Sequence, residues 1–144
     1  MDKALNYLAL ARKAGLIELG EEPVGAVARA RKARLVIVAE DATNHTWRRA
    51  RSFVADSEQI CIKVPFSKDQ LGLAVGRTAL ALAAFTDPAL ALAFLKALGQ
   101  PEKYEKELTC LEATSNRIKQ RQQEAKAHAR NKAMGLRSKA KKER

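Results

Sequence analysis

Residues 34–39 read Arg-Leu-Val-Ile-Val-Ala, an apolar run rich in β-branched side chains after its single arginine. Because no polar residue interrupts the apolar ones, the run predicts a central strand that is covered on both faces. Residues 59–64 predict a second buried strand, and helical patterns flank both runs. This alternation predicts an α/β fold, a three-layer α/β/α sandwich around a small sheet of about four strands.

Capping signals place the first elements of this sandwich. Asp2 is placed to cap a helix that Gly15 ends, and residues 17–19 follow as a short strand. Pro23 fits the first position of a second helix, with Glu22 as its cap, because proline needs no hydrogen-bond acceptor there.

The second half of the sandwich is bounded in the same way. Asp41 or Thr43 is expected to cap a third helix, and residues 67–70 have the form of a capping box for a fourth, which stops near Gly72 or Gly76. The last two expected elements are a strand at residues 78–85 and a helix at residues 87–99.

Positive charge is concentrated at the C-terminus. Lys and Arg number 27 against 16 Asp and Glu, a formal net charge of +11, which favours an anionic partner. Residues 1–116 hold 16 basic and 14 acidic residues, whereas residues 117–144 hold 11 basic and 2 acidic ones. We therefore expect a globular domain over residues 1–99, a bridging helix over 100–116 and a basic tail over 117–144, which has too few apolar residues to fold alone.

An apolar stripe at helical spacing, Tyr104, Leu108, Leu111 and Ile118, predicts a helix that packs against the sandwich or against a protein partner. The tail is rich in helix formers and as a helix would reach about 42 Å. Its alternative interpretation is a solubilising tail without a defined site. The cations expected to contact RNA phosphates there are Arg117, Lys119, Arg121, Lys126, Arg130, Lys132, Arg137 and Lys139.

Several classes of protein are disfavoured by the residues present. No apolar run approaches the roughly 20 residues of a membrane span, and the amphipathic N-terminus lacks a signal-peptide core, so we expect a cytoplasmic protein. Two cysteines, Cys61 and Cys110, and two histidines, His45 and His128, show no metal-ligand spacing. Without a nucleophile and base, or a phosphate loop, we expect no enzyme, no cofactor and no metal. Cys61 is interpreted as a small buried apolar side chain.

The order of elements, with several short motifs, resembles the ribosomal protein L-seven-Ae superfamily, and its bacterial branch of small ribosome-associated or kink-turn-binding RNA proteins most of all. The resemblance covers about residues 3–98. The motifs that carry it are residues 8–15 (Leu-Ala-Leu-Ala-Arg-Lys-Ala-Gly), 20–22 (Gly-Glu-Glu), 33–42 (Ala-Arg-Leu-Val-Ile-Val-Ala-Glu-Asp-Ala), 71–72 (Leu-Gly), Gly76 and 85–87 (Phe-Thr-Asp). The resemblance implies binding to structured RNA, with ribosomal RNA and the ribosome as partners.

The family's RNA surface carries over onto residues 20–26 and 76–80, which the resemblance places side by side. In archaeal relatives the first segment carries an asparagine, a glutamate and a lysine that read a kink-turn. Here Gly20 matches the motif, Glu22 stands at the asparagine position, Pro23 replaces the glutamate and Ala26 replaces the lysine. Arg29, one turn beyond Ala26, is placed to supply part of the missing charge.

The remaining candidate contacts follow from the same resemblance. Glu21 and Glu22 have an alternative role in favourable contact with the dipole of their helix. The cluster Arg48, Arg49 and Arg51 is interpreted as a solvated helix face. The other residues expected at or near the RNA surface are Arg12, Lys13, Lys32, Gly76, Arg77, Thr78 and Ala79.

The sequence thus predicts a non-enzymatic RNA-binding protein, associated with the large ribosomal subunit or its assembly. Two segments would recognise local RNA shape and the tail would anchor on phosphates. The alternative is a protein-interaction adaptor of the same fold that binds its partner through the apolar stripe of residues 104–118.

Overall fold

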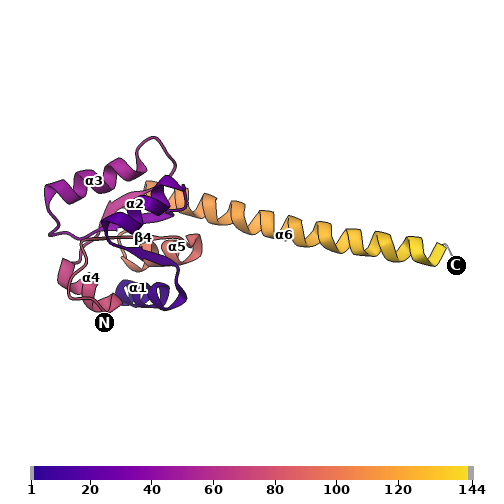
Figure 1. The fold of residues 1–144 in the computed structure, drawn as a ribbon, viewed down its shortest axis with the longest axis horizontal. Helices are drawn as coiled ribbons and strands as arrows, with labels where there is room; N and C mark the ends of the chain where they lie inside the picture. Colours follow the sequence, from indigo (N-terminus) through magenta and orange to yellow (C-terminus); the bar gives the residue numbers. More distant parts are fainter. Residues whose placement is uncertain (1, 143–144) are drawn as a thin grey trace.

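The computed structural model describes the backbone of residues 2–142 and the side chains of residues 2–130. Its four-stranded sheet has the order β1-β4-β2-β3, with β1 at Ile17–Leu19, β2 at Leu35–Val38, β3 at Cys61–Lys63 and β4 at Leu82–Phe85. β4 pairs antiparallel with both β1 and β2, while β2 and β3 are parallel. The predicted α/β fold with a small sheet is confirmed (Figure 1).

The central strand β2 supplies side chains to two separate cores. Leu35 and Ile37 join the larger core, whereas Val36 and Val38 join the smaller one, and all four are fully buried. This division follows from the alternation of side chains along a strand. Helices α2 (Glu21–Arg29) and α3 (Asn44–Val54) cover the smaller core. The opposite face is covered by α1 (Lys3–Ala14), α4 (Lys68–Val75), α5 (Pro88–Ala97) and the start of α6 (Glu105–Lys142).

Most helix boundaries agree with their capping signals. Asp2 accepts a hydrogen bond from the Ala4 amide, and Gly15 ends α1 in the left-handed conformation. Ser67 and Gln70 form the expected capping box of α4, and Asp87 caps α5. These motifs are confirmed because they depend on residues close together in the chain.

Thr43, rather than Asp41, caps α3. The Asp41 carboxylate instead accepts a hydrogen bond of 2.8 Å from the backbone amide of Lys68 and so ties the β2–α3 turn to the start of α4. Both strands are also shorter than the runs at residues 59–64 and 78–85 predict. In the second run, residues 76–81 form a loop over α4, so β4 begins only at Leu82.

The prediction that Glu22 caps α2 is wrong. Gly20 is the N-cap, at φ 95°, and makes no side-chain bond, while Glu21 and Glu22 occupy the first turn. Pro23 is then the third helical residue, whose amide would have no partner inside the helix, so proline is tolerated there. The conformation of Gly20 lets the helix begin two residues earlier than Pro23 indicates.

The apolar stripe lies against the protein's own sandwich. Tyr104 and Leu111 are buried in the larger core, with Leu108 packed against them. The prediction of a protein partner at Tyr104, Leu108, Leu111 and Ile118 is therefore wrong for the buried residues, and so is the adaptor alternative that depends on them. Ile118 is half-buried in the same helix.

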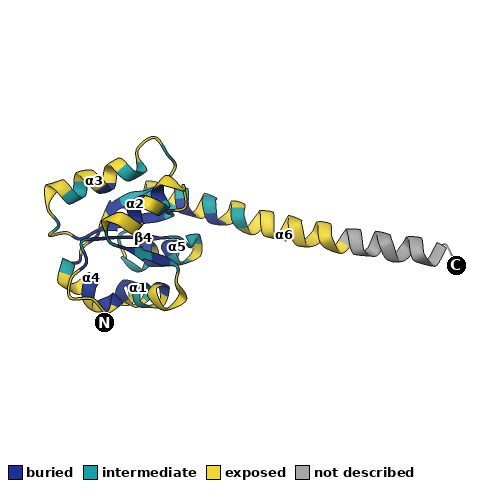
Figure 2. Cartoon of the chain, viewed as in Figure 1, coloured by how far each residue is buried: buried dark blue, intermediate teal, exposed yellow. Residues whose placement is uncertain are grey.

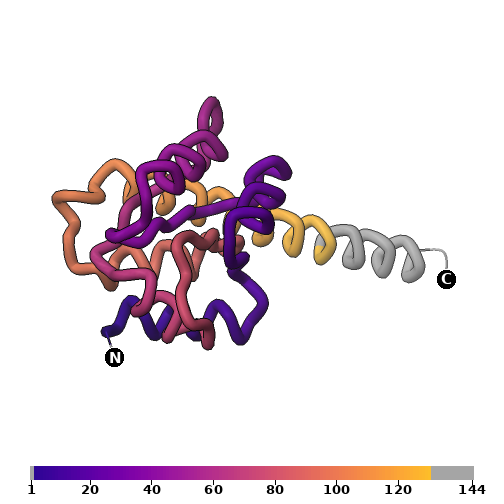
Figure 3. Tube along the Cα trace, turned by 60° about the vertical axis from the view of Figure 1, so that its left-hand side comes forward, coloured from indigo at the N-terminus to yellow at the C-terminus, as the bar shows by residue number. Residues whose placement is uncertain are grey.

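Beyond this contact α6 leaves the sandwich as a single rod (Figure 1). The helix starts at Glu105, later than the predicted residue 100, and crosses the predicted boundary at residue 116 without a break. Residues 119–130 are all exposed (Figure 2). Figure 3 follows the chain from α5 into α6 and shows the same projection from a second direction. Of the described helices, none has the length and apolarity to cross a membrane.

Candidate nucleic-acid interface

Two exposed segments meet at one end of the sheet, where β1 ends and β4 begins. The Gly20 amide donates a hydrogen bond of 3.1 Å to the carbonyl of Leu82, which joins the start of α2 to the strand after the 76–80 loop. A Cβ on Gly20 would lie 3.9 Å from a guanidinium nitrogen of Arg77. The segments 20–26 and 76–80 therefore lie side by side, as the resemblance implies, and we call this end of the sheet the loop end.

The 76–80 loop is held by a close approach to α4. A Cβ on Gly72 would lie 2.7 Å from the Ala79 Cα and 2.9 Å from the Arg77 carbonyl oxygen, so only glycine fits there. The Arg77 amide donates to the Gly72 carbonyl at 2.8 Å, and the Leu80 amide donates to the Lys68 carbonyl at 3.0 Å. Gly72 thus lies inside α4 as a packing residue, while Gly76 ends the helix at φ 78°.

The loop presents four exposed residues in a fixed backbone conformation. Gly76, Arg77, Thr78 and Ala79 are all exposed, whereas Leu80 is buried and anchors the loop in the core. Arg77 thus provides a guanidinium beside the start of α2. Because a guanidinium carries five N–H donors and stays charged, Arg77 is suited to a phosphate or a base edge.

The start of α2 carries two exposed carboxylates, of which one is paired. Arg49 Nε lies 2.6 Å from Glu21 Oε1, and the Arg49 guanidinium also lies 5.4 Å from the centre of the Phe53 ring. Arg48, Arg49 and Arg51 are all exposed, as the interpretation as a solvated helix face predicts, and the ion pair with Glu21 places Arg49 near the loop end. Glu21 and Arg49 lie on different helices, so no sequence spacing relates them.

Arg29 lies where its guanidinium reaches back along α2. A Cβ on Gly25 would lie 3.4 Å from an Arg29 guanidinium nitrogen and 3.2 Å from the Phe53 ring. Ala26 is exposed, and Arg29 is exposed one turn further on. Arg29 is thus attached one turn farther from the loop end than Ala26, but its guanidinium returns the positive charge to the side of Gly25.

Three candidate cations lie away from the loop end. Lys32 follows the C-terminal end of α2, a helix of nine residues or about 14 Å. Arg12 and Lys13 occupy the last turn of α1, which leads into the start of β1. β1 then runs toward the loop end, so all three residues lie nearer the opposite end of the sheet.

The tail cations fall into two groups. Five are described and exposed on α6: Arg117 and Arg121 lie where the helix passes the sandwich, and Lys119, Lys126 and Arg130 are spread around the helix. The side chains of Lys132, Arg137 and Lys139 lie outside the described residues, although their backbone belongs to α6.

Cys61 and Trp47 pack against the smaller core, on the face of the sheet that α2 and α3 cover. Burial raises the pKa of the Cys61 thiol to about 12, with a smaller opposing effect from Arg51, so the thiol stays protonated at neutral pH. Trp47 is half-buried, with Arg51 and Lys63 within 6 Å of its ring. In the described part of the chain, no group of three or more His, Cys, Asp and Glu side chains has the arrangement of a metal site.

No family model matches the chain, and no curated protein matches it. A solved structure of a protein with unknown function from Bacillus halodurans is similar at a TM-score of 0.64 and 23% identity, over 69% of this chain and 99% of that chain. A 15.5 kD RNA-binding protein from Giardia lamblia is similar at a TM-score of 0.55 and 22% identity, over 69% of this chain and 84% of that chain. At these identities the likeness establishes a shared fold.

Proposed function

We propose that this chain is a cytoplasmic, non-enzymatic protein that binds structured RNA, with ribosomal RNA as the expected target. The observation that carries the proposal is the contact between the two exposed segments, where Arg77 lies beside Gly20. The fold is shared with the Giardia lamblia protein, whose name describes RNA binding. That likeness supports RNA as the class of partner.

The geometry of the loop end suits recognition of RNA shape. RNA with bulges or sharp turns presents unstacked bases and a distorted backbone, which a rigid surface distinguishes from a regular duplex. Here the 76–80 loop is fixed by Gly72 and the α2 start is fixed by its bond to Leu82. A surface ordered before binding loses little conformational entropy when RNA docks.

Helix α6 supplies the complementary part of the proposal. Its exposed cations surround a rod that extends from the sandwich, and cations that neutralise phosphates release condensed counterions. The loop end would then select the RNA, while α6 adds affinity that depends on salt but not on sequence.

Kink-turn recognition is the finer proposal, and it rests on the resemblance of residues 20–26 and 76–80. With Glu22 at the asparagine position and Ala26 at the lysine position, Arg77 and Arg29 are the cations available near the RNA. The Glu22 carboxylate only accepts hydrogen bonds, whereas the side-chain amide of asparagine both accepts and donates. Glu22 would therefore recognise the amino groups of bases but not their acceptor atoms.

Electrophoretic mobility shifts test both levels of the proposal. The full chain is titrated against a kink-turn RNA and against a regular duplex of the same length and composition. Tighter binding to the kink-turn is expected. Equal affinity for the two would overturn kink-turn recognition, and binding to neither would overturn RNA binding.

Arg77→Gln then tests the surface. We expect affinity for the preferred RNA to fall about tenfold, since a charge-assisted contact is lost. Lys96→Gln is the matched control, because it removes the same charge from α5, where Lys96 pairs with Glu112 at 3.4 Å. An equal loss in both variants would show that only total charge matters.

A further inference from the structure

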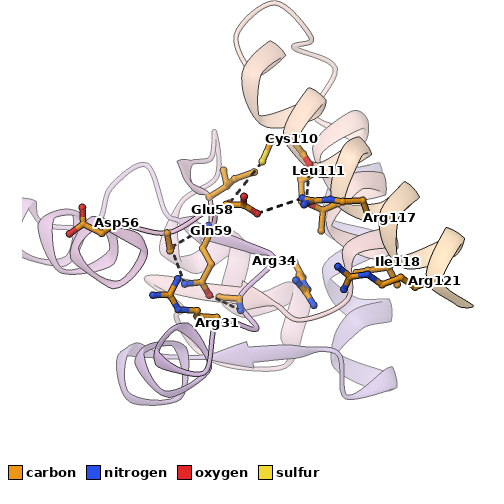
Figure 4. A pocket seen from close by; sticks show the side chains of 14 residues that line it. Arg31, Arg34, Asp56, Glu58, Gln59, Cys110, Leu111, Arg117, Ile118 and Arg121 are labelled. Atoms are coloured by element: carbon orange, nitrogen blue, oxygen red, sulfur yellow. Dashed lines mark hydrogen bonds and ion pairs between the residues drawn. The ribbon is translucent and has the colours of Figure 1, made fainter.

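A second basic site lies at the end of the sheet opposite the loop end. A cleft of about 710 Å³ opens between α6 and the segments that precede β2 and β3 (Figure 4). Arg31 and Arg34 come from the segment between α2 and β2, and Arg117 and Arg121 from α6. Four guanidinium groups from two distant parts of the chain thus line one cavity.

The acidic residues of this cleft do not balance its arginines. Two carboxylates line it, Asp56 and Glu58. Glu58 Oε2 lies 3.5 Å from Arg117 Nη2, whereas Figure 4 shows Asp56 at the far side of the cleft from Arg34 and Arg121. Within the described side chains, Arg31, Arg34 and Arg121 form no salt bridge. The cleft therefore carries net positive charge.

Arg34 is the residue that most clearly points to an anionic ligand. Its Nε atom is buried and has no hydrogen-bond partner among the described residues. Its backbone amide donates to the Phe85 carbonyl at 2.7 Å, so the residue is fixed to the end of the sheet. A guanidinium cannot give up its proton, so a buried Nε–H without an acceptor favours binding of an anion that provides one.

The walls of the cleft are held by Gln59. Its side-chain oxygen accepts from the Ala33 amide at 3.0 Å, and its nitrogen donates to the Ala28 carbonyl at 3.1 Å. These bonds join the start of β3 to the end of α2, next to Arg31 and Arg34. The side-chain amide is engaged in this framework, which leaves the arginines as the groups that can hold a ligand.

We propose that this cleft binds a phosphate group, supplied by the RNA backbone. Guanidinium groups recognise phosphate oxygens through paired N–H donors, and several of them together suit a group that carries full negative charge. The polymer is the favoured source because α6 carries further exposed cations beyond the cleft, Lys126 and Arg130, on other sides of the helix. An RNA backbone that wraps α6 would contact these cations and the cleft together, which a free phosphate cannot do. This inference rests on the proposed RNA binding and adds a contact site at the opposite end of the sheet.

NMR of the arginine side chains tests the site in the full chain. The Nε–Hε signal of Arg34 is followed during titration with inorganic phosphate and, separately, with a short RNA duplex. We expect saturable movement with both, and tighter binding for RNA. If the Arg34 signal moves with phosphate but the chain binds no RNA, the cleft is an anion site, and the proposal that RNA supplies the phosphate is overturned. RNA binding that leaves the Arg34 signal unmoved would overturn the cleft while the proposed function stands.

Substitution gives the quantitative test. Arg31→Gln with Arg34→Gln is expected to lower RNA affinity about tenfold at low salt and to reduce the slope of log K against log salt by about 1 to 2. The double variant Arg31→Gln with Arg121→Gln changes exposed positions only. It replaces the Arg31→Gln, Arg34→Gln variant in this test if that variant does not fold. Lys96→Gln should leave the slope within about 0.5 of the original. Unchanged affinity and slope in a folded double variant would overturn the proposal.

Discussion

The Tyr104 hydroxyl donates a hydrogen bond of 3.1 Å to the backbone carbonyl of Lys63 in the edge strand β3. Tyr104 is itself buried, so one residue closes the larger core and ties the start of α6 to the sheet. The direction of the exposed part of α6 depends on this attachment. The positions of its cations relative to the sandwich therefore depend on it as well.

Tyr104→Phe should lower the free energy of unfolding by about 1 kcal/mol, because the Lys63 carbonyl loses its side-chain partner while the ring still packs. Denaturation in urea measures the change. Tyr7→Phe, at a half-buried position of α1, is the control and should change stability by less than about 0.5 kcal/mol. Equal effects would contradict the stabilising role of the bond.

Gly72→Ala should destabilise the protein by about 1 to 3 kcal/mol, because the added Cβ meets the backbone of Ala79 at 2.7 Å. The sign of the change in the free energy of unfolding is informative, because replacing glycine with alanine inside a helix normally stabilises the helix. Leu73→Ala, at a neighbouring position that is 74% exposed, should stay within about 0.5 kcal/mol. A stabilised Gly72→Ala variant would show that the loop moves aside freely.

The sequence predicts the elements whose boundaries depend on residues close together in the chain, and it does not predict those that depend on contacts between distant segments. The apolar run of β2 and the capping box at Ser67 are local, and both are found. The start of α2 depends on Gly20, whose φ of 95° accompanies its pairing with Leu82 across the sheet. Likewise, the loop before β4 follows from the contact of Gly72 with Ala79, and no spacing in the sequence encodes that contact.

The candidate site divides in the same way. Gly20 and Arg77 were predicted neighbours because a family resemblance carries three-dimensional information that spacing lacks. The pairing of Arg49 with Glu21 is not predicted by the sequence, since the two residues belong to different helices. The sequence gives no sign that the Nε atom of Arg34 is buried without a partner among the described residues, at the far end of the sheet.

Glu21→Gln should raise affinity for RNA by about twofold to fivefold, because it removes a negative charge and releases Arg49 at the loop end. The pair is exposed, so stability should change by less than about 1 kcal/mol. Glu112→Gln makes the same charge change at the pair with Lys96. If it raised affinity equally, the effect would come from net charge alone. Mobility shifts at fixed salt provide the comparison.

Cys61 should react slowly with iodoacetamide in the folded chain. Its pKa is raised by burial from 9.0 to about 12, so at pH 8 the thiolate fraction is about a thousandfold below that of an ordinary thiol. The rate should keep rising about tenfold per pH unit above pH 9, where an ordinary thiol levels off. Mass spectrometry of the Cys110→Ala variant isolates the reaction at Cys61. Rapid labelling at pH 8 that levels off near pH 9 would contradict the raised pKa of this partly buried thiol.

The central claim is that the loop end selects the RNA while α6 contacts its phosphates. The salt dependence of RNA affinity tests this claim most directly. The full chain is compared with the triple variant Lys119→Gln, Lys126→Gln and Arg130→Gln on a kink-turn RNA and on a regular duplex of the same length, between about 50 and 200 mM salt. We predict that log K falls linearly with log salt, and that the slope is smaller by about 2 to 3 in the variant while the preference between RNAs is kept. Identical slopes for the two proteins, or loss of the preference between RNAs in the variant, would contradict the account.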